Sequence, residues 1–429
     1  MTGRPLHPAV MARLHSRLEE LGTISEEPGR LTRRIFSPAL DSVHHRFHAW
    51  ADAAGLQFSV DALQNMRIRW PQPHVSRSPA TETPGAVLVV GSHLDTVRDA
   101  GRFDGTLGVV AGLTCVEQLQ AWGVTLPFDL EVVGFSDEEG LRFQTAYLGS
   151  SYYAGVFRPE WLSLRDDSGQ SLAQLLESRG TNPSIVTSTP TVPTQVIGYL
   201  ELHIEQGPQL ETLGIPVAVV SAIAAQTRAR LRFIGSAGHA GTTPMRLRKD
   251  ALCAAAEAIL EIEGQARKVE GLRATVGQIR IEPGASNVIP ERVTLSLDIR
   301  HEKDHCLQEA LAELKVQVDR KAADRGITVD WEWAQQGPSV PMAPALRAHL
   351  QQAAESRQGP TPHLASGAGH DAAIMARLGP TGMLFVRCRD GLSHHPAEWA
   401  SPEDIEVGVA VLVDAIVALG NAQSNRHSA

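Results

Sequence analysis

The sequence predicts an α/β protein in which a large, mainly parallel sheet with helices on both faces is interrupted by a smaller four-stranded α/β sandwich. Strand and helix patterns alternate along the first third of the chain, which is typical of a parallel sheet covered on both sides. The stretch from about Thr227 to Trp333 has an order of its own: strand, helix, strand, strand, helix, strand. At 429 residues the chain exceeds the size at which one hydrophobic core usually stops growing, so at least two domains are expected.

The first strands of the larger domain are short apolar runs. AVLVV before Gly91 is typical of a buried strand, GTLGVVAGLTCVEQLQAWG of a helix, and LEVVGF of the next strand. The polar segments GSHLD and SDEEG follow these two strands directly. Because ligands of such sheets bind beyond the carboxyl ends of the strands, we expect the functional side chains there.

The smaller domain is predicted to begin with the alternating strand TRARLRFIG and the helix DALCAAAEAILEIEGQAR. Two strand segments follow, RATVGQIRIEPG and NVIPERVTLSLDIR, and then the helix LQEALAELKVQVDRKAADRG and the strand ITVDWEW. This order is typical of a ferredoxin-like sandwich. We place it at residues 221–336, inserted into a discontinuous larger domain of residues 1–220 and 337–429.

The remaining segments belong to the larger domain. The strand MLFVR is followed by a final helix, for which Ser401 and Pro402 form a typical N-terminus. The stretch from about Arg165 to Thr194 is rich in Ser, Thr and Pro, and we interpret it as partly loop.

Composition excludes several classes of function. Hydrophobic residues at 43% and charged residues at 20% are average for a globular protein, and the net charge of -9 disfavours nucleic acid as a partner. The N-terminus lacks the apolar core of a signal peptide, and no uninterrupted apolar run approaches the ~18 residues that span a bilayer. We therefore expect no membrane partner and a cytoplasmic protein. The cysteines form no close pair, which agrees with a reducing compartment: Cys115, Cys253, Cys306 and Cys388.

Candidate metal ligands follow the first predicted strand. His93 and Asp95 stand in GSHLDTV, where the imidazole could bind a metal ion while the carboxylate fixes its tautomer. Asp104 in GRFDG is flanked by glycine, which allows close approach to an ion. Taken alone, a His-x-Asp pair is more often surface chemistry or a helix cap, and Asp104 could be a turn residue.

More residues of this kind follow later in the chain. FSDEEG places Glu138 and Glu139 at the next strand end, where one acid could bind a metal ion and its neighbour act as a base. His203 in ELHIEQGP and His394 in GLSHHPAEW supply further imidazoles. Adjacent acids alone usually form a solvated turn. Together, however, five ligand-type residues with a glutamate base, mostly at predicted strand ends, make metal binding a strong hypothesis.

The chain resembles the amidase, hydantoinase and carbamoylase family of dinuclear-metal hydrolases, which is similar to the zinc carboxypeptidases. The resemblance runs from about Leu31 to the last helix. It is carried by a series of blocks in the family's order: GSHLDTV, GRFDGTLGVVAG, SDEEGLRF, LELHIEQGP, GHAGTTPMRLRKDA, NVIP, DIR, ASGAGHDA and SHHPAE. An ordered series of this length is highly specific.

This resemblance implies two divalent metal ions per subunit, zinc or manganese, since His, Asp and Glu ligands suit both. It implies that Glu138 is the general base and that Asp95 orients His93. His203 stands where peptidase relatives carry a carboxylate, which favours the carbamoylase branch. The implied ligand sets share one carboxylate between the ions: His93, Asp104 and His203 for one ion, and Asp104, Glu139 and His394 for the other.

The resemblance also implies a set of substrate contacts. Arg300 in DIRH and Asn287 in ASNVIP would bind the substrate carboxylate, and His239 in GSAGHAGTTPM would polarise the scissile carbonyl. Gln206 and His370 resemble further contacts. Singly, Arg300 could pair with a surface acid and Asn287 could cap a turn.

The implied reaction is hydrolysis of a ureido or carbamoyl C–N bond in a small carboxylate, with release of ammonia and carbon dioxide. The blocks LASGAGHD, MLFVRCRDG and GHAGTTPM are most similar to those of allantoate amidohydrolases, which places allantoate first, ahead of N-carbamoyl-L-amino acids and ureidoglycolate. An aminoacylase or peptidase, or a binder without catalysis, is a less favoured alternative. The resemblance implies a homodimer through the inserted domain, in which His239 of one subunit completes the site built on Glu138 of the other.

Overall fold

The computed structural model describes residues 3–73, 85–188 and 195–427, and the chain folds into two compact units. The first unit comprises Met1–Ser221, Met342–Leu364 and His370–Ala429. The second comprises Ala222–Pro341 and Ala365–Gly369. The sequence predicts that the larger domain carries the catalytic metal centre and that the inserted domain acts as a lid and in dimerisation, and these roles stay predictions.

The first unit is built on a mixed sheet with the strand order β1-β2-β4-β3-β5-β16-β6, and β15 also pairs with β6. The pairs β3-β4, β3-β5 and β5-β16 are parallel, whereas β1-β2, β2-β4 and β16-β6 are antiparallel. The predicted mainly parallel sheet is therefore confirmed at its centre. Its strands are β1 (Gln57–Val60), β2 (Met66–Trp70), β3 (Val87–His93), β4 (Asp129–Phe135), β5 (Val196–Ile204), β6 (Val217–Ile223), β15 (His363–Ser366) and β16 (Thr381–Val386).

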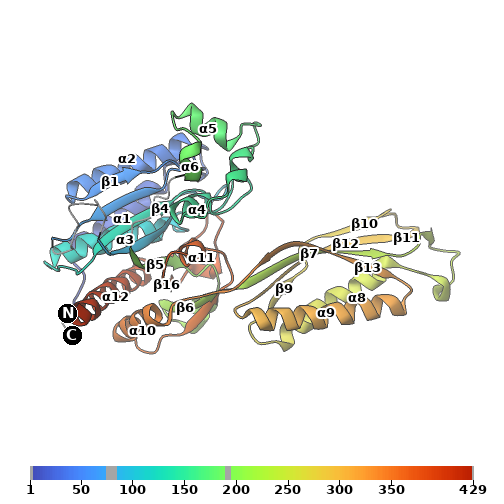
Figure 1. The fold of residues 1–429 in the computed structure, drawn as a ribbon. Helices are drawn as coiled ribbons and strands as arrows, with labels where there is room; N and C mark the ends of the chain where they lie inside the picture. The colour runs from blue at the N-terminus through green and yellow to red at the C-terminus, as the bar shows by residue number, and fades with distance from the viewer. Residues whose placement is uncertain (1–2, 74–84, 189–194, 428–429) are drawn as a thin grey trace. The chain divides into compact units, whose positions relative to one another are not determined.

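Helices cover this sheet (Figure 1). Every residue of β3 and β4 is buried, as expected for strands covered on both faces. A large apolar core lies between the sheet and α1, α2, α3, α10 and α12, while α11 packs on β5, β16 and α4. The helices are α1 (Pro8–Leu21), α2 (Pro38–Ala53), α3 (Thr106–Ala121), α4 (Leu148–Tyr153), η1 (Pro159–Ser163), α5 (Leu172–Ser178), α6 (Ser184–Ser188), α7 (Gln209–Leu213), α10 (Pro344–Gln358), α11 (Ala372–Met375), η3 (Arg389–Gly391) and α12 (Pro402–His427).

The final helix, α12, begins as the sequence predicts, because the Ser401 hydroxyl accepts the N–H of Asp404 at 3.0 Å. Residues Pro402–Asn425 are long and apolar enough to cross a membrane, with a mean hydropathy of 1.9, but 67% of that window is buried. Asp414 within it pairs with Arg357 at 2.8 Å. A core helix meets the same criteria of length and composition, so α12 is weak evidence for a membrane.

The second unit is the predicted sandwich. Its main sheet has the antiparallel order β10-β12-β7-β13, β9 also pairs with β12, and β8 and β11 form a small separate sheet. Figure 1 shows α8 and α9 on one face of the main sheet. The elements are β7 (Ala225–Ile234), β8 (Gly238–His239), η2 (Met245–Leu247), α8 (Ala251–Lys268), β9 (Arg273–Thr275), β10 (Ile279–Glu282), β11 (Val288–Ile289), β12 (Arg292–His301), α9 (Asp304–Asp324), β13 (Thr328–Gly337) and β14 (Val340–Pro341).

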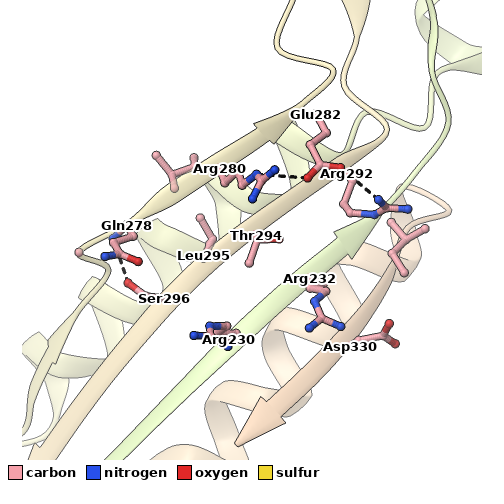
Figure 2. A pocket seen from close by; sticks show the side chains of 13 residues that line it. Arg230, Arg232, Gln278, Arg280, Glu282, Arg292, Thr294, Leu295, Ser296 and Asp330 are labelled. Carbon is pink, nitrogen blue, oxygen red and sulfur yellow. Dashed lines mark hydrogen bonds and ion pairs between the residues drawn. The ribbon is translucent and has the colours of Figure 1, made fainter. Parts of the chain in front are cut away.

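The other face of this sheet carries charged side chains around a shallow hollow of about 1030 Å³ (Figure 2). Residues along β7 alternate between buried and exposed, so Arg230 and Arg232 both point away from the helices. Both guanidiniums contact Glu332 on β13. We call this surface the arginine ladder: Arg230 and Arg232 on β7, Arg280 and Glu282 on β10, Arg292 on β12, and Asp330 and Glu332 on β13.

Candidate active site and metal centre

Asp104 lies at the centre of the candidate site, in the loop that leads into α3. His93 ends β3 and His203 lies near the end of the neighbouring strand β5, so the parallel pairing brings both imidazoles to one edge of the sheet. Nε2 of His93 is 3.5 Å and Nε2 of His203 is 3.1 Å from Asp104 Oδ1. On the other carboxylate oxygen, His394 Nε2 is 3.2 Å from Asp104 Oδ2 and also 3.1 Å from Glu139 Oε1. The structure thus brings together all the predicted metal ligands.

The orientation of the His93 and His203 imidazoles shows whether their free ring nitrogens can bind a metal ion. His93 Nδ1 lies 3.0 Å from the main-chain oxygen of Asp95, and His203 Nδ1 lies 2.9 Å from that of Ile204. A carbonyl oxygen only accepts, so each Nδ1 carries a proton and the Nε2 of a neutral ring presents a lone pair. Among the described residues, His203 Nε2 and Asp104 Oδ1 are buried without a hydrogen-bond partner.

Acceptor atoms that face one another at 3.1–3.5 Å require a cation or protons between them. Ligands at ~2.0–2.1 Å from a tetrahedral zinc ion lie about 3.3 Å apart, so the spacing fits a shared cation. Without a cation, protons lie between these atoms. Burial lowers the pKa of His93, but the nearby carboxylates of Asp104, Glu138 and Asp95 outweigh burial and raise this pKa. Asp104 and Glu139 likewise raise the pKa of His394 to about 10. The donor set therefore fits divalent cations.

Glu138 and Glu139 lie in the turn after β4, and Asp95 holds this turn. One carboxylate oxygen of Asp95 accepts the N–H of Glu138 at 3.0 Å, and the other accepts the N–H of Glu139 at 3.1 Å. The predicted contact of the Asp95 carboxylate with His93 is long, at 3.7 Å, because the main-chain oxygen of Asp95 occupies Nδ1 instead. Asp95 thus contacts His93 through its backbone and the two glutamates through its side chain.

Glu138 is buried, and ligand atoms of Glu138, Glu139 and His93 lie within 4.8 Å of one another. Burial raises the pKa of Glu138, His93 opposes this, and Glu139 adds to it. A raised pKa is the direction that a general base working near neutral pH needs. The position and the environment of Glu138 therefore suit its predicted role.

Two residues that the sequence reasoning did not single out, Ser393 and Glu398, contact Asp104. The Ser393 hydroxyl lies 2.7 Å from Asp104 Oδ2, and Glu398 Oε1 accepts the N–H groups of Phe103 and Asp104 at 2.8 and 3.1 Å. Burial and the neighbouring Asp104 raise the pKa of Glu398 to about 7. Both residues belong to the SHHPAE block that contains His394. Their place beside a candidate metal ligand was the sequence signal that could have identified them.

The predicted substrate contacts of the first unit lie close to the ligands. Gln206 has a left-handed backbone (φ 56°), and its Nε2 donates to Asp104 Oδ2 at 2.9 Å. The ring of His370 is buried and lies 4.5 Å from that of His203, edge to face. Gln206 therefore contacts a metal-ligand candidate directly.

The predicted contacts of the second unit fall into two groups. His239 on β8 is paired with Val288, and the main-chain oxygen of Asn287 accepts the N–H of Ala240 at 3.0 Å, so His239 and Asn287 lie on adjacent segments. Arg300 lies near the far end of β12, about 26 Å from its start at ~3.3 Å per residue. Asn287 and Arg300 are therefore separated by the length of β12 within one chain, and their shared contact with a substrate carboxylate stays a prediction.

Arg300 is held rigidly at its own end of β12. Its Nε and one terminal nitrogen donate to the two carboxylate oxygens of Asp298 at 2.7 and 2.8 Å, and another terminal nitrogen donates to the main-chain oxygen of Gly367. Arg300 therefore does form an ion pair with a neighbouring acid, which is the alternative interpretation of this residue from the sequence. Only 23% of the Arg300 side chain is exposed.

A covered mixed sheet with a cluster of His, Asp and Glu ligands at its strand ends defines a metal-dependent hydrolase. The chain belongs to peptidase family M20/M25/M40, whose family model matches residues 89–418. Within that family its relatives act on C–N bonds other than peptide bonds, and the chain is such a hydrolase.

Three comparisons illustrate the relationship. The chain is 38% identical to N-carbamoyl-L-amino acid amidohydrolase of Geobacillus stearothermophilus, over 96% of this chain and 99% of that protein. It is 37% identical to allantoate deiminase of Arabidopsis thaliana, over 96% of this chain and 83% of that protein. A crystal structure of an amidase of the hydantoinase/carbamoylase family from Burkholderia multivorans matches with a TM-score of 0.87 and 33% identity, over 96% of this chain and 99% of that one.

Proposed function

We propose that this protein hydrolyses the ureido C–N bond of a small carboxylated substrate, with allantoate as the first candidate. The observation that carries the proposal is the convergence of three imidazoles and Glu139 on the buried carboxylate of Asp104, with Glu138 beside them. Allantoate comes first because of the blocks around His239, His370 and Arg387. N-carbamoyl-L-amino acids are the second candidate, because a relative of that name is 38% identical over almost the full length of both proteins.

Two divalent cations, zinc or manganese, would share Asp104. When bound, such ions polarise a carbonyl and generate a nucleophile from water near neutral pH. The ligand groups that support two positions are His93, Asp104 and His203 for one ion, and Asp104, Glu139 and His394 for the other.

The side chains around this centre have separate tasks in the proposal. Glu138 takes a proton from the attacking water and returns it to the leaving nitrogen, which its burial beside His93 supports. Asp95 keeps Glu138 in place through the main-chain N–H that it accepts. Arg300, held flat by Asp298, binds the substrate carboxylate, and His239 stabilises the negative charge that develops on the ureido oxygen.

The separation of His239 and Asn287 from Arg300 along β12 supports a shared site. We propose a cytoplasmic homodimer in which the second unit mediates the contact and His239 of one subunit acts in the site built on Glu138 of the other. Twofold symmetry makes each site identical, so a mixed dimer tests this arrangement.

The dimer experiment combines a Glu138→Gln subunit with a His239→Ala subunit under different tags. If His239 acts in the neighbouring site, one of the two sites is intact and the mixed dimer regains roughly half of the wild-type activity. A mixed dimer as inactive as both parents would exclude the shared site.

The function itself is tested by a panel of substrates. Purified protein loaded with zinc or with manganese is given allantoate, ureidoglycolate, N-carbamoyl-L-amino acids, N-acetyl amino acids and dipeptides, and ammonia or amino-acid release is measured. Allantoate should give the highest kcat/KM. Turnover confined to N-carbamoyl-L-amino acids selects the second candidate, and turnover confined to dipeptides or N-acetyl amino acids refutes the proposal.

A further inference from the structure

Glu398 joins two loops that lie far apart in the sequence. Its side chain is buried, with 3% exposed, and its Oε1 accepts the N–H groups of Phe103 and of Asp104 itself, at 2.8 and 3.1 Å. The contact leaves no free space, since a Cβ added at Gly101 would lie 2.3 Å from the Glu398 side chain. The backbone that carries Asp104 is therefore fixed by a residue of the loop that carries His394.

A second connection runs through Ser393 to the carboxylate of Asp104. The Ser393 hydroxyl lies 2.7 Å from Asp104 Oδ2 and 3.2 Å from Glu398 Oε2, and it accepts from Gln206 Nε2 at 3.1 Å. Oδ2 is thus held by hydrogen bonds, whereas Oδ1 has no such partner among the described residues and faces His93 and His203. These hydrogen bonds fix the direction in which the shared carboxylate points.

A buried glutamate that accepts main-chain N–H groups often does no more than hold a loop. The chain contains a matched example in Glu205, which is also buried and accepts the N–H groups of Gln209 and Leu210, both at 2.8 Å. The two N–H groups that Glu205 accepts belong to the first turn of α7, whereas those that Glu398 accepts belong to the loop that carries Asp104. Glu205 therefore serves as a control for the loss of a buried carboxylate that anchors the main chain of a different segment.

We propose that Glu398 is a positioning residue for the metal centre. It acts through the main-chain N–H of Asp104 and through Ser393 to aim the carboxylate that two divalent ions share, and so it sets the affinity of the centre for both ions. The inference rests on the proposed function, and it concerns ion binding rather than turnover. Partners that orient metal ligands are worth ~10–100-fold in metal affinity.

The test measures ion binding directly. Metal-free wild type and the variants Glu398→Ala, Glu398→Gln, Ser393→Ala and Glu205→Ala are titrated with zinc and, separately, with manganese against a chromogenic chelator. Thermal melting of each metal-free variant is recorded in parallel, because a change in folding alone appears there. Wild type that binds neither ion would refute the proposed function and would be recognised before any variant is compared.

Glu398→Ala should bind both ions ~10–100-fold more weakly, and Ser393→Ala about 10-fold more weakly with an unchanged melting temperature. Glu398→Gln should recover most of the affinity, because its amide oxygen still accepts both N–H groups and its amide nitrogen can donate to Ser393. Glu205→Ala should lower the melting temperature and keep wild-type ion affinity. Wild-type ion affinity in Ser393→Ala would overturn the proposal, as would a loss of ion affinity in Glu205→Ala equal to that in Glu398→Ala. If Glu398→Ala does not fold, the ion affinity of Ser393→Ala decides the question.

Discussion

The metal centre and the arginine ladder are made of charged side chains with opposite surroundings. At the centre, Asp104 is 5% exposed, and other buried acids, Asp95 and Glu138 among them, lie nearby. On the ladder, Arg280 is 80%, Arg230 61% and Glu332 44% exposed. Glu282 and Glu332 each pair with two arginines. Exposed ion pairs contribute little because water already solvates them, whereas buried charges must be compensated. The difference teaches that burial, rather than the number of charges, marks the functional region.

Removal of divalent ions should produce the largest effect. Without cations, the acceptor atoms of His93, His203 and Asp104 face one another, and hydrolysis should cease. The measurement is ammonia release after prolonged chelation, with metal content followed by elemental analysis and activity restored by zinc or manganese. Full activity in a preparation shown to be metal-free would contradict the proposed centre.

Glu138→Gln and Glu139→Gln should separate the two roles proposed for these neighbouring acids. Glu138→Gln should keep both ions and lose at least ~100-fold in turnover, the usual contribution of a positioned general base. Glu139→Gln should weaken one ion site. Metal analysis beside kcat measurement distinguishes them, and the reverse pattern would exchange the two assignments.

His44 tests whether burial also shifts the pKa of a side chain away from the metal centre. Burial lowers the pKa of His44 to about 4 from its ordinary 6.5, against the opposing charge of Asp41. Between these values the unfolded chain binds a proton that the folded chain does not, so stability falls as the pH falls. From pH 7 to pH 5 this amounts to about 2 kcal/mol.

The measurement for His44 is urea denaturation of wild type and His44→Gln at several pH values. The difference in unfolding free energy between them should shrink by that amount as the pH is lowered to 5. A constant difference would show that His44 titrates normally.

Arg300→Ala and Arg230→Ala compare two arginines of the same sheet, one 23% and the other 61% exposed. Arg300→Ala should raise the KM for carboxylate substrates at least ~10-fold, because a hydrogen bond to a charged group is worth ~1.5–3 kcal/mol. An uncharged amide analogue should be affected much less. Arg230→Ala is the control and should change KM less than about twofold. Equal losses on both substrates would assign Arg300 a structural role.

Glu332→Gln on the ladder should have the smallest effect. Its pairs with Arg230 and Arg232 are exposed, so the unfolding free energy should change by less than about 1 kcal/mol, and by less still at high salt. Chemical denaturation at two salt concentrations measures this. A loss of several kcal/mol would remove the distinction between the two regions.

The sequence predicted the parts of the site that depend on local pattern. His93 and Glu138 are expected at or just beyond the ends of buried strands, and the apolar runs before them form β3 and β4. The strand β5, which carries His203, is not among the predicted strands. The order of elements in the second unit followed from periodicity in the same way. One local signal was overlooked: Ser171 and Gln174 form a capping box that begins α5, inside the stretch interpreted as partly loop.

The remaining features depend on distance along the chain. Glu398 contacts the backbone of Asp104 although the two residues are 294 positions apart in the sequence, and no local pattern in either loop predicts this contact. Asn287 and Arg300 are only 13 positions apart in the sequence, yet the extended backbone of β12 separates them in space. The part of the Arg165–Thr194 prediction that covers residues 189–194 lies outside the described residues.

The contact between Glu398 and Asp104 also bears on the order in which the parts of the site form during synthesis of the chain. Synthesis runs from the N-terminus, so His93, Asp104 and His203 leave the ribosome before the whole of the second unit, while Ser393, His394 and Glu398 leave after it. Asp104 gains its contacts with Ser393 and Glu398 only after the last segment has been made. Under the proposed function, stable metal loading therefore waits for the last segment, and proteolytic removal of residues 390–429 is expected to release ions as well as a peptide.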